Sequence, residues 1–203
     1  MNALSSMLAR MRTKHEVGTR ERIVRATSRL MQRQGYEGTG LKDISREAEA
    51  TLGSVYHFFP GGKVELAVEA IGHGDREFAD LLRTVLERED DPADAMVACA
   101  RELATGMRDS EWMDGCPVTT TALESARRLP QVRDAAERAF AHWHGIVRDK
   151  LTATGFDDAT ASDLAHTVVS TFEGAEMTAQ ITHSTTPLDL AGTHLARLVR
   201  SYR

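Results

Sequence analysis

The sequence predicts an all-α protein, and three observations support that class. Apolar residues recur with a period near 3.6 along most of the chain. No segment alternates apolar and polar residues with β-branched enrichment, and none carries a hairpin turn such as Asn-Gly. Prolines mark the starts and stops of helical patterns, because proline lacks an N–H and only the N–H groups of the first helical turn have no partner within the helix. The prolines are Pro60, Pro92, Pro117, Pro130 and Pro187.

Composition narrows the class further. The 203 residues suffice for one large or two small domains, and 41% hydrophobic with 27% charged residues is ordinary for a folded soluble protein. Two cysteines make no disulfide framework, and no apolar run is long enough to span a bilayer, so we expect a cytoplasmic protein. The first 71 residues carry a net charge of +3 and the rest −8, which favours an anion-binding N-terminal part on an acidic body.

The first four segments follow in order. Residues 1–18 lack a continuous apolar core and a cleavage site, so we expect a flexible, mildly basic arm there rather than a signal peptide. A helix is expected over about 19–34, ended by Gly35 as the left-handed residue after its last turn. A second, short helix is expected over about 41–48, and Thr51 can cap a third over about 52–58.

Six longer segments complete the chain. A long helix is expected from about Lys63 to Glu89, in which Gly72 and Gly74 soften the helix at a cost of ~1 kcal/mol each relative to alanine. Further helices are expected over about 92–109, 117–126, 130–153, 158–183 and 187–202, joined by short loops.

Two short helices joined by a tight turn and braced by a third form the helix-turn-helix plan, whose second helix enters the DNA major groove. Residues 51–63, TLGSVYHFFPGGK, suit that second helix. Gly53 and Ser54 leave room for close approach to DNA, and the Ser54 hydroxyl can bond a base edge. Tyr56 and His57 can bond phosphate oxygens, and Lys63 can add a charged phosphate contact.

Two other interpretations of this segment need weighing. In the DNA-binding interpretation, Val55 and Phe59 point the other way, into a small core. The first alternative is a plain packed helix without a DNA partner. The Gly61-Gly62-Lys63 run also suggests a phosphate-binding loop, but that pattern needs glycine and Ser/Thr where the chain has His57 and Val64. We therefore exclude the phosphate loop.

Residues 19–71 resemble the N-terminal domain of the TetR family of transcriptional regulators. The features that match are Thr-Arg-x-x-Ile at 19–23, Gly-Tyr-Glu-Gly-Thr at 35–39, Asp43-Ile44, Gly-Ser-Val-Tyr-His at 53–57 and Phe59-Pro60. Phe-Pro-Gly-Gly-Lys at 59–63 and Gly-Cys-Pro-Val at 115–118 are similar to the LmrA/YxaF-like branch of that family. The resemblance implies a DNA-binding domain at 19–62 and a ligand-binding and dimerisation domain at 63–203.

The resemblance also implies residue roles. Base contacts would come from Thr51, Leu52, Gly53 and Ser54, backbone contacts from Tyr56, His57 and Lys63, and Lys42 would reach phosphate or base.

Three positions depart from the family pattern. Glu49 stands where glycine is usual, so a non-glycine residue has to take a left-handed conformation. Ala50 replaces the usual valine and removes some packing. Leu52 stands where lysine or arginine is frequent; it cannot bond guanine, but it can pack on a thymine methyl group.

The family pattern implies that the last two helices pack against their copies in a four-helix dimer interface. The candidates are Leu164, Val168, Ala175, Leu188, Ala191, Leu195 and Leu198, for which an intramolecular core is the alternative. Aromatic and sulfur side chains suit an apolar effector pocket, and the candidates are Trp112, Cys116, Trp143, Phe172 and Met177. Plain core packing is again the alternative for each.

No pattern indicates a metal, a cofactor or catalysis. His142 and His144 point about 200° apart on a helix, which does not suit one metal ion. Neither His-Glu-x-x-His nor paired Cys-x-x-Cys occurs. We expect no catalytic residue, and a cytoplasmic homodimeric repressor released from a palindromic double-stranded operator by a small molecule. A ligand-independent DNA-binding activator and a small helical enzyme remain alternatives.

Overall fold

The computed structural model describes residues 17–203, so the expected arm lies almost entirely outside the described residues. All regular elements of the described part are helices, which confirms the predicted class. They are α2 (Thr19–Gly38), α3 (Leu41–Glu47), α4 (Leu52–Phe58), α5 (Gly62–Arg88), α6 (Pro92–Asp109), α7 (Pro117–Ser125), α8 (Pro130–Ala153), α9 (Asp158–Thr182) and α10 (Thr186–Ser201).

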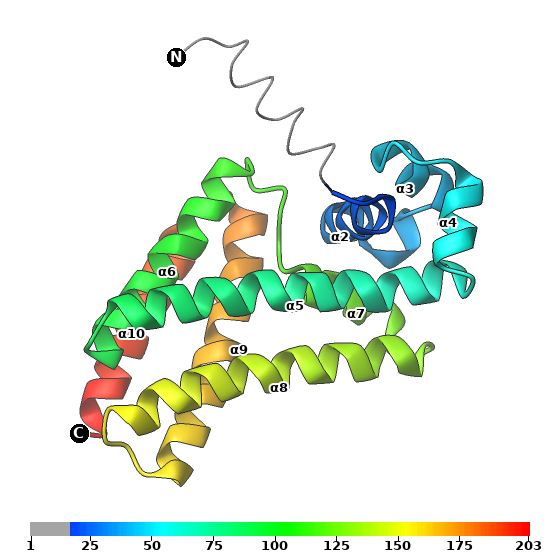
Figure 1. Ribbon diagram of the computed structural model, residues 1–203. Coiled ribbons are helices and arrows are strands. Elements are labelled where there is room, and N and C mark those ends of the chain that lie inside the picture. Colours follow the sequence, from blue (N-terminus) through cyan, green and yellow to red (C-terminus); the bar gives the residue numbers. More distant parts are fainter. Residues whose placement is uncertain (1–16) are drawn as a thin grey trace.

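Helices α2, α3 and α4 form a head at one end of the molecule (Figure 1). Helix α5 runs from this head through the body, with α8 packed beside it. Helix α6 packs on α10, and α9 contacts both α8 and α10. The body meets the head through α5 and α7, which both contact α2.

Four helices begin at a residue whose side chain caps them: α4, α6, α7 and α9. Asp157 Oδ1 accepts a hydrogen bond from Thr160 N at 3.0 Å, and Asp91 Oδ1 accepts two such bonds at the start of α6. These bonds satisfy N–H groups that have no partner within the helix. Prolines occupy the first turn of α6, α7, α8 and α10, as their missing N–H requires.

The end of α2 differs from the expectation. Gly35 adopts the predicted left-handed φ of 74°, but a further helical turn follows it and reaches Gly38. The φ angle requires glycine, and an added Cβ would also displace the Glu124 carboxylate of α7. Gly35 therefore makes a kink where α2 meets α7.

The softening role predicted for Gly74 is corrected by its packing. Gly74 is buried, and a Cβ added there would lie 2.5 Å from Cγ of Pro117 at the start of α7. Gly72 differs, since its added Cβ would meet only the end of the Arg76 side chain, at 3.5 Å. Gly74 thus lets α5 approach α7 closely.

The described residues form two apolar cores, one in the body and one in the head. The larger core fills the body, and Ala67 of α5 belongs to it. Leu66, one residue earlier, belongs to the smaller core in the head, so α5 is part of both units. The head core consists of Ile23, Val24, Ala26, Ile44, Ala48, Val55, Phe59 and Leu66.

Candidate nucleic-acid interface

Helix α4 is anchored by one face and presents the other to solvent. Val55 and Phe59 are fully buried in the head core, as the sequence predicted. Tyr56 and His57 project from the exposed face, and 52% of Tyr56 is accessible. The His57 ring meets the ring of Phe58 edge-on, with the centroids 5.0 Å apart. A short helix held this way offers polar groups to a partner without losing its packing.

The start of α4 joins two residues that were predicted to contact bases. Thr51 Oγ1 accepts a hydrogen bond from Ser54 N at 3.0 Å and lies 2.9 Å from the Ser54 hydroxyl. Thr51 therefore caps the helix and also fixes the Ser54 side chain. Gly53 is exposed, and Leu52 is partly buried beside it.

The turn between α3 and α4 contains the predicted left-handed residue. Glu49 has a φ of 50°, and Ala50 N donates to Ser45 O at 2.9 Å. Arg22 of α2 donates from Nε to the Ala48 carbonyl at 3.2 Å. The bond ties the turn to α2.

The two lysines of the predicted site have different surroundings. Lys42 is exposed on α3 and has no ion pair among residues 17–203. Lys63 donates from Nζ to the Glu37 carbonyl at 3.4 Å, with Nζ 4.4 Å from the centroid of the Tyr36 ring. Lys63 thus ties the start of α5 to the end of α2 in addition to its predicted role at phosphate.

Most arginines of the head form ion pairs with carboxylates, which the sequence analysis did not predict. Each of four arginines lies within ion-pair distance of a carboxylate. The spacing of two of these pairs, i to i+4 and i to i+3, was visible in the sequence. The pairs are Arg20–Glu69, Arg25–Glu21, Arg29–Glu47 and Arg46–Asp43.

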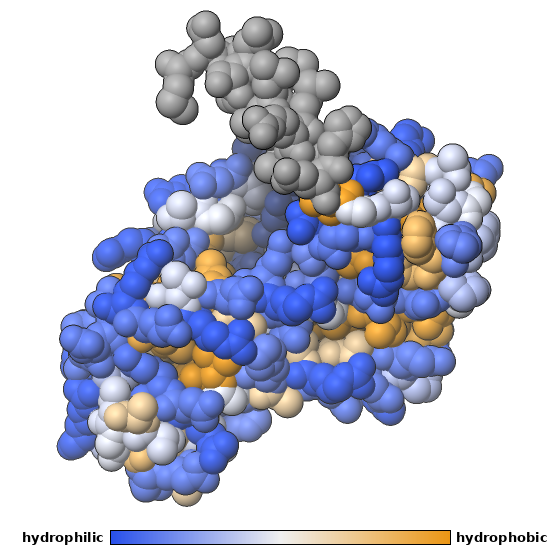
Figure 2. All heavy atoms as spheres, in the orientation of Figure 1, coloured by the Kyte–Doolittle hydropathy of each residue, from blue (hydrophilic) through white to orange (hydrophobic). Residues whose placement is uncertain are grey.

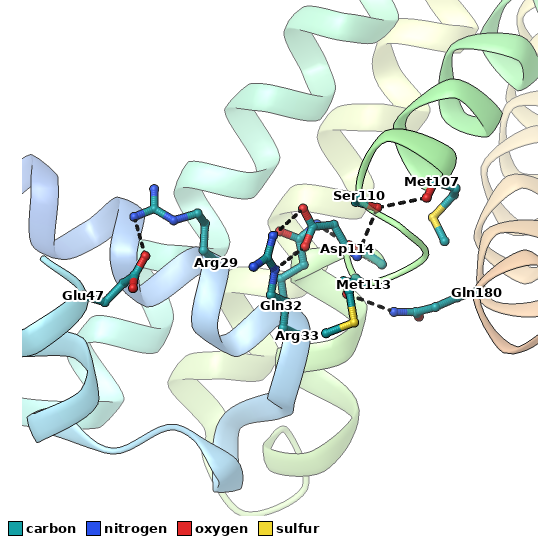
Figure 3. Close-up of polar contacts among 10 residues, drawn as sticks. Arg29, Gln32, Arg33, Glu47, Met107, Ser110, Met113, Asp114 and Gln180 are labelled. Carbon is teal, nitrogen blue, oxygen red and sulfur yellow. Dashed lines mark hydrogen bonds and ion pairs between the residues drawn. The ribbon is translucent and has the colours of Figure 1, made fainter. Parts of the chain in front are cut away.

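The head is bonded to the body beside Gly35. Arg33 makes two contacts with the Asp114 carboxylate, at 2.5 and 3.2 Å, and Gln32 Nε2 donates to Gly115 O at 2.5 Å (Figure 3). Glu37 pairs with Arg128, which holds the pKa of that carboxyl below its usual range. No local sequence signal identifies these bonds, since their partners lie about 80 residues or more apart.

The candidates for an effector pocket differ in how deeply they are buried. Trp143 is fully buried with its ring edge-on to Phe78, and Phe172 is also buried. Both serve the core, which was the alternative left open. Met177 is 53% exposed, and Trp112 is partly buried.

Cys116 lies at a polar cluster inside the body. Its Sγ caps α7 by accepting from Thr119 N at 3.4 Å, and Thr119 donates from Oγ1 to Glu173 Oε2 at 2.5 Å. Burial raises the pKa of the Glu173 carboxyl, and burial together with Glu173 raises the pKa of Glu176 to about 8. Burial also raises the pKa of the Cys116 thiol well above its usual value, which disfavours the reactive thiolate.

The candidates for the dimer interface lie on the inner faces of α9 and α10. Leu198 is partly buried, and the other six are buried within the single chain: Leu164, Val168, Ala175, Leu188, Ala191 and Leu195. These six form intramolecular core, the alternative left open, because an amphipathic helix turns its apolar stripe to its own body first. Met177, Ile181 and Leu190 instead expose more than half of their surface on these helices.

No group of three or more ligand residues able to hold a metal occurs in the part of the chain that the structure describes. His142 bonds Asp75 through Nδ1 at 2.9 Å and Arg83 through Nε2 at 2.6 Å. His144 turns to another side and lies against the ring of His166 of α9, with centroids 3.9 Å apart. The two histidines diverge, as their spacing predicted.

A hollow of about 540 Å³ lies between α5 and α8, close to the head. Val64, Val68 and Leu129 supply its apolar wall, where Figure 2 shows a band of apolar surface. None of the effector-pocket candidates lines it.

Two family models match the chain. The model for bacterial regulatory proteins of the tetR family matches residues 23–70, and the model for the C-terminal domain of LmrA/YxaF-like transcriptional regulators matches 92–194. Among residues 17–203, no helix is both long and apolar enough to cross a membrane.

Curated relatives agree with these models. The HTH-type transcriptional regulator YxaF of Bacillus subtilis is 34% identical over 90% of this chain and 95% of its own length. The HTH-type transcriptional regulator LmrA of the same organism is 34% identical, over 84% of this chain and 90% of its own. The crystal structure of a TetR transcriptional regulator from Chloroflexus aurantiacus is 26% identical, with a TM-score of 0.73, covering 93% and 96% of the two chains.

Proposed function

The chain belongs to the TetR family of bacterial transcriptional regulators, in its LmrA/YxaF-like branch, and we propose that it is a homodimeric repressor released from a palindromic operator by a small-molecule effector. Residues 19–62 form the DNA-binding domain in this proposal, and 63–203 the ligand-binding and dimerisation domain. The carrying observation is α4, which buries Val55 and Phe59 and presents Tyr56 and His57.

The proposed DNA contacts follow from the layout of the head. The N-terminal end of α4 would enter the major groove, where its side chains can contact the edges of the bases. Phosphate contacts would fix its register. The proposed base contacts are Thr51, Leu52, Gly53 and Ser54, and the proposed phosphate contacts are Lys42, Tyr56, His57 and Lys63.

Dimerisation is supported by the exposed face of α9 and α10. One seven-residue helix reads few bases, whereas a two-fold dimer reads two half-sites. Met177, Ile181 and Leu190 expose apolar surface on the two helices. A Cβ added at Gly174 of α9 would meet nothing within 4 Å, so this side is open to close approach by a partner helix.

The effector would act by a population shift between dimers with different head spacing. It must bind the state whose α4 helices no longer match half-sites one helical turn, about 34 Å, apart, because equal affinity for both states shifts nothing. The polar cluster of Cys116, Thr119 and Glu173 supports a site in the body, since such groups orient ligands among apolar walls. A cytoplasmic location belongs to the same proposal.

The test begins with gel shifts on DNA that flanks the protein's own gene. We expect a concentration-dependent complex for the parent, and at least tenfold weaker binding for Tyr56→Ala, an exposed substitution that leaves the core intact. Ile181→Asp should shift the sedimentation coefficient of the free protein from dimer to monomer. A monomeric parent, or one without operator affinity, would contradict the proposal.

A further inference from the structure

We propose that the loop between α6 and α7, residues 110–116, positions the DNA-reading head by linking α2 to α9. This loop is called the strap below. The inference rests on the proposed function, and it concerns how the body controls the head. Figure 3 shows the strap crossing between the two helices, with bonds to each.

The head side of the strap consists of two adjacent residues that hold α2. Asp114 binds Arg33 at two points, 2.5 and 3.2 Å, and this hydrogen-bonded pairing raises the pKa of the Arg33 guanidinium. The Gly115 carbonyl accepts from Gln32 Nε2 at 2.5 Å. A two-point arginine–carboxylate pair fixes direction as well as distance, so a shift of the strap turns α2.

The body side of the strap rests on α9. Gln180 donates from Nε2 to the Met113 carbonyl at 3.3 Å. The same side chain packs directly on Gly115, where an added Cβ would lie 2.6 Å from Gln180 Oε1. Gly115 is therefore in contact with α9 and hydrogen-bonded to α2. Trp112 adds a second contact by stacking on His183, with centroids 6.0 Å apart.

The strap has one tightly fixed shape. Glu111 and Trp112 both adopt left-handed φ angles, 52° and 65°, which non-glycine residues rarely take. Trp112 N donates to Met107 O at 2.8 Å, and Asp114 N donates to the Ser110 hydroxyl at 3.3 Å. Because these bonds and φ angles hold the strap in one conformation, we expect it to pass on a displacement rather than absorb it.

The strap gives the body a second route to the head that does not pass along α5. Its last residue, Cys116, caps α7, and Thr119 in that first turn bonds Glu173 of α9. A ligand that displaces α9 or α7 therefore acts on Gln32 and Arg33 through the strap, without involving α5. Gln180 and Asp114 are positioning residues in this account, because neither touches DNA.

Amide hydrogen exchange on the full chain, without DNA or effector, tests the link. Gln180→Ala on α9 should raise exchange at the C-terminal turns of α2, residues 32–38, on the order of two- to tenfold, as expected for losing one hydrogen bond. Asp114→Asn should raise exchange reciprocally at 176–182. Both side chains lie at the surface or partly exposed, so the fold should survive each change.

The matched control is Arg29→Gln, which breaks an exposed ion pair of the same kind inside the head, Arg29–Glu47 at 3.1 Å. It should leave 176–182 unchanged. The proposal would be overturned if Gln180→Ala raised exchange only in the strap and α9 and left exchange in α2 at the rate of the parent. Because the measurement uses no DNA, failure of operator binding contradicts the proposed function without touching this result.

Discussion

Lys63 lies over the ring of Tyr36, with Nζ 4.4 Å from the ring centroid and 3.4 Å from the Glu37 carbonyl. The lysine proposed to contact phosphate is therefore already held against the end of α2. A cation at an aromatic face is stabilised and keeps its positive charge, so it can still attract a phosphate. Lys63 can therefore have two roles, as a phosphate contact and as a link between α5 and α2, and experiments can separate them.

The salt dependence of operator binding separates phosphate contacts from structural ones. We expect Lys42→Met and Lys63→Met each to reduce the slope of log K against log salt by about 0.9, the effect of one phosphate contact. Lys150→Met is the control, since Lys150 donates to Glu89 O in the body at 2.5 Å. An unchanged slope for Lys63→Met would mean that Lys63 is only a link between α5 and α2.

Leu52 should recognise a thymine methyl group. Replacing the thymine opposite Leu52 by uracil should weaken binding of the parent about fourfold, since a buried methyl group contributes about 0.8 kcal/mol. Leu52→Ala should lose sensitivity to that replacement, and Leu52→Lys should gain a preference for guanine. A strict guanine requirement of the parent at this position would disprove the assignment.

Thr51 should stabilise α4 through its cap. Thr51→Ala removes the bond to Ser54 N, and we expect the free energy of unfolding to fall by about 1 kcal/mol. Thr51→Ser keeps the hydroxyl and should stay within a few tenths of the parent. Urea unfolding monitored by circular dichroism measures both; equal stability of the alanine and serine variants would speak against a cap.

Gly72 and Gly74, in the middle of α5, should respond in opposite ways. Gly74→Ala forces a methyl group against Pro117 and should cost about 1–3 kcal/mol, as overpacking does. Gly72→Ala meets little but the Arg76 side chain and should gain up to about 1 kcal/mol from helix propensity. Thermal unfolding of the two single variants compares them. Equal gains would show that α5 and α7 separate easily.

Glu176 should make stability fall as pH rises. Its pKa is raised from 4.5 to about 8 by burial and by Glu173, so the folded state holds a proton that the unfolded state releases. The stabilisation from this proton is complete below pH 4.5 and is lost as pH rises through about 8. Glu176→Gln should flatten that loss in unfolding experiments between pH 5 and 8.5. A parallel pH profile for parent and variant would contradict the shift.

Local signals in the sequence predicted most of the fold. The caps, prolines and apolar periods that define α6 to α10 are short-range features. The inward face of α4 followed from the same periodicity, which placed Val55 and Phe59 in the core. Glu49, Ala50 and Leu52 stood out only against the family pattern.

The packing of distant segments was not predictable from these signals. Gly74 was interpreted as a soft point of a helix, because the sequence does not show that Pro117 lies against it. Apolar stripes and the family pattern predict the dimer candidates, and the structure places six of them in the core of one chain. A periodic stripe shows that a face is buried, but not what covers it.

The sequence by itself determined that this protein is an all-α helix-turn-helix regulator, because helix periods, caps and a fifty-residue motif are written in neighbouring residues. Only the tertiary structure decided how the head is held. The bonds from Arg33 to Asp114 and from Gln180 to Met113 join residues 81 and 67 positions apart. Such contacts depend on how helices pack in space, and no local pattern encodes the partner of a side chain across that distance.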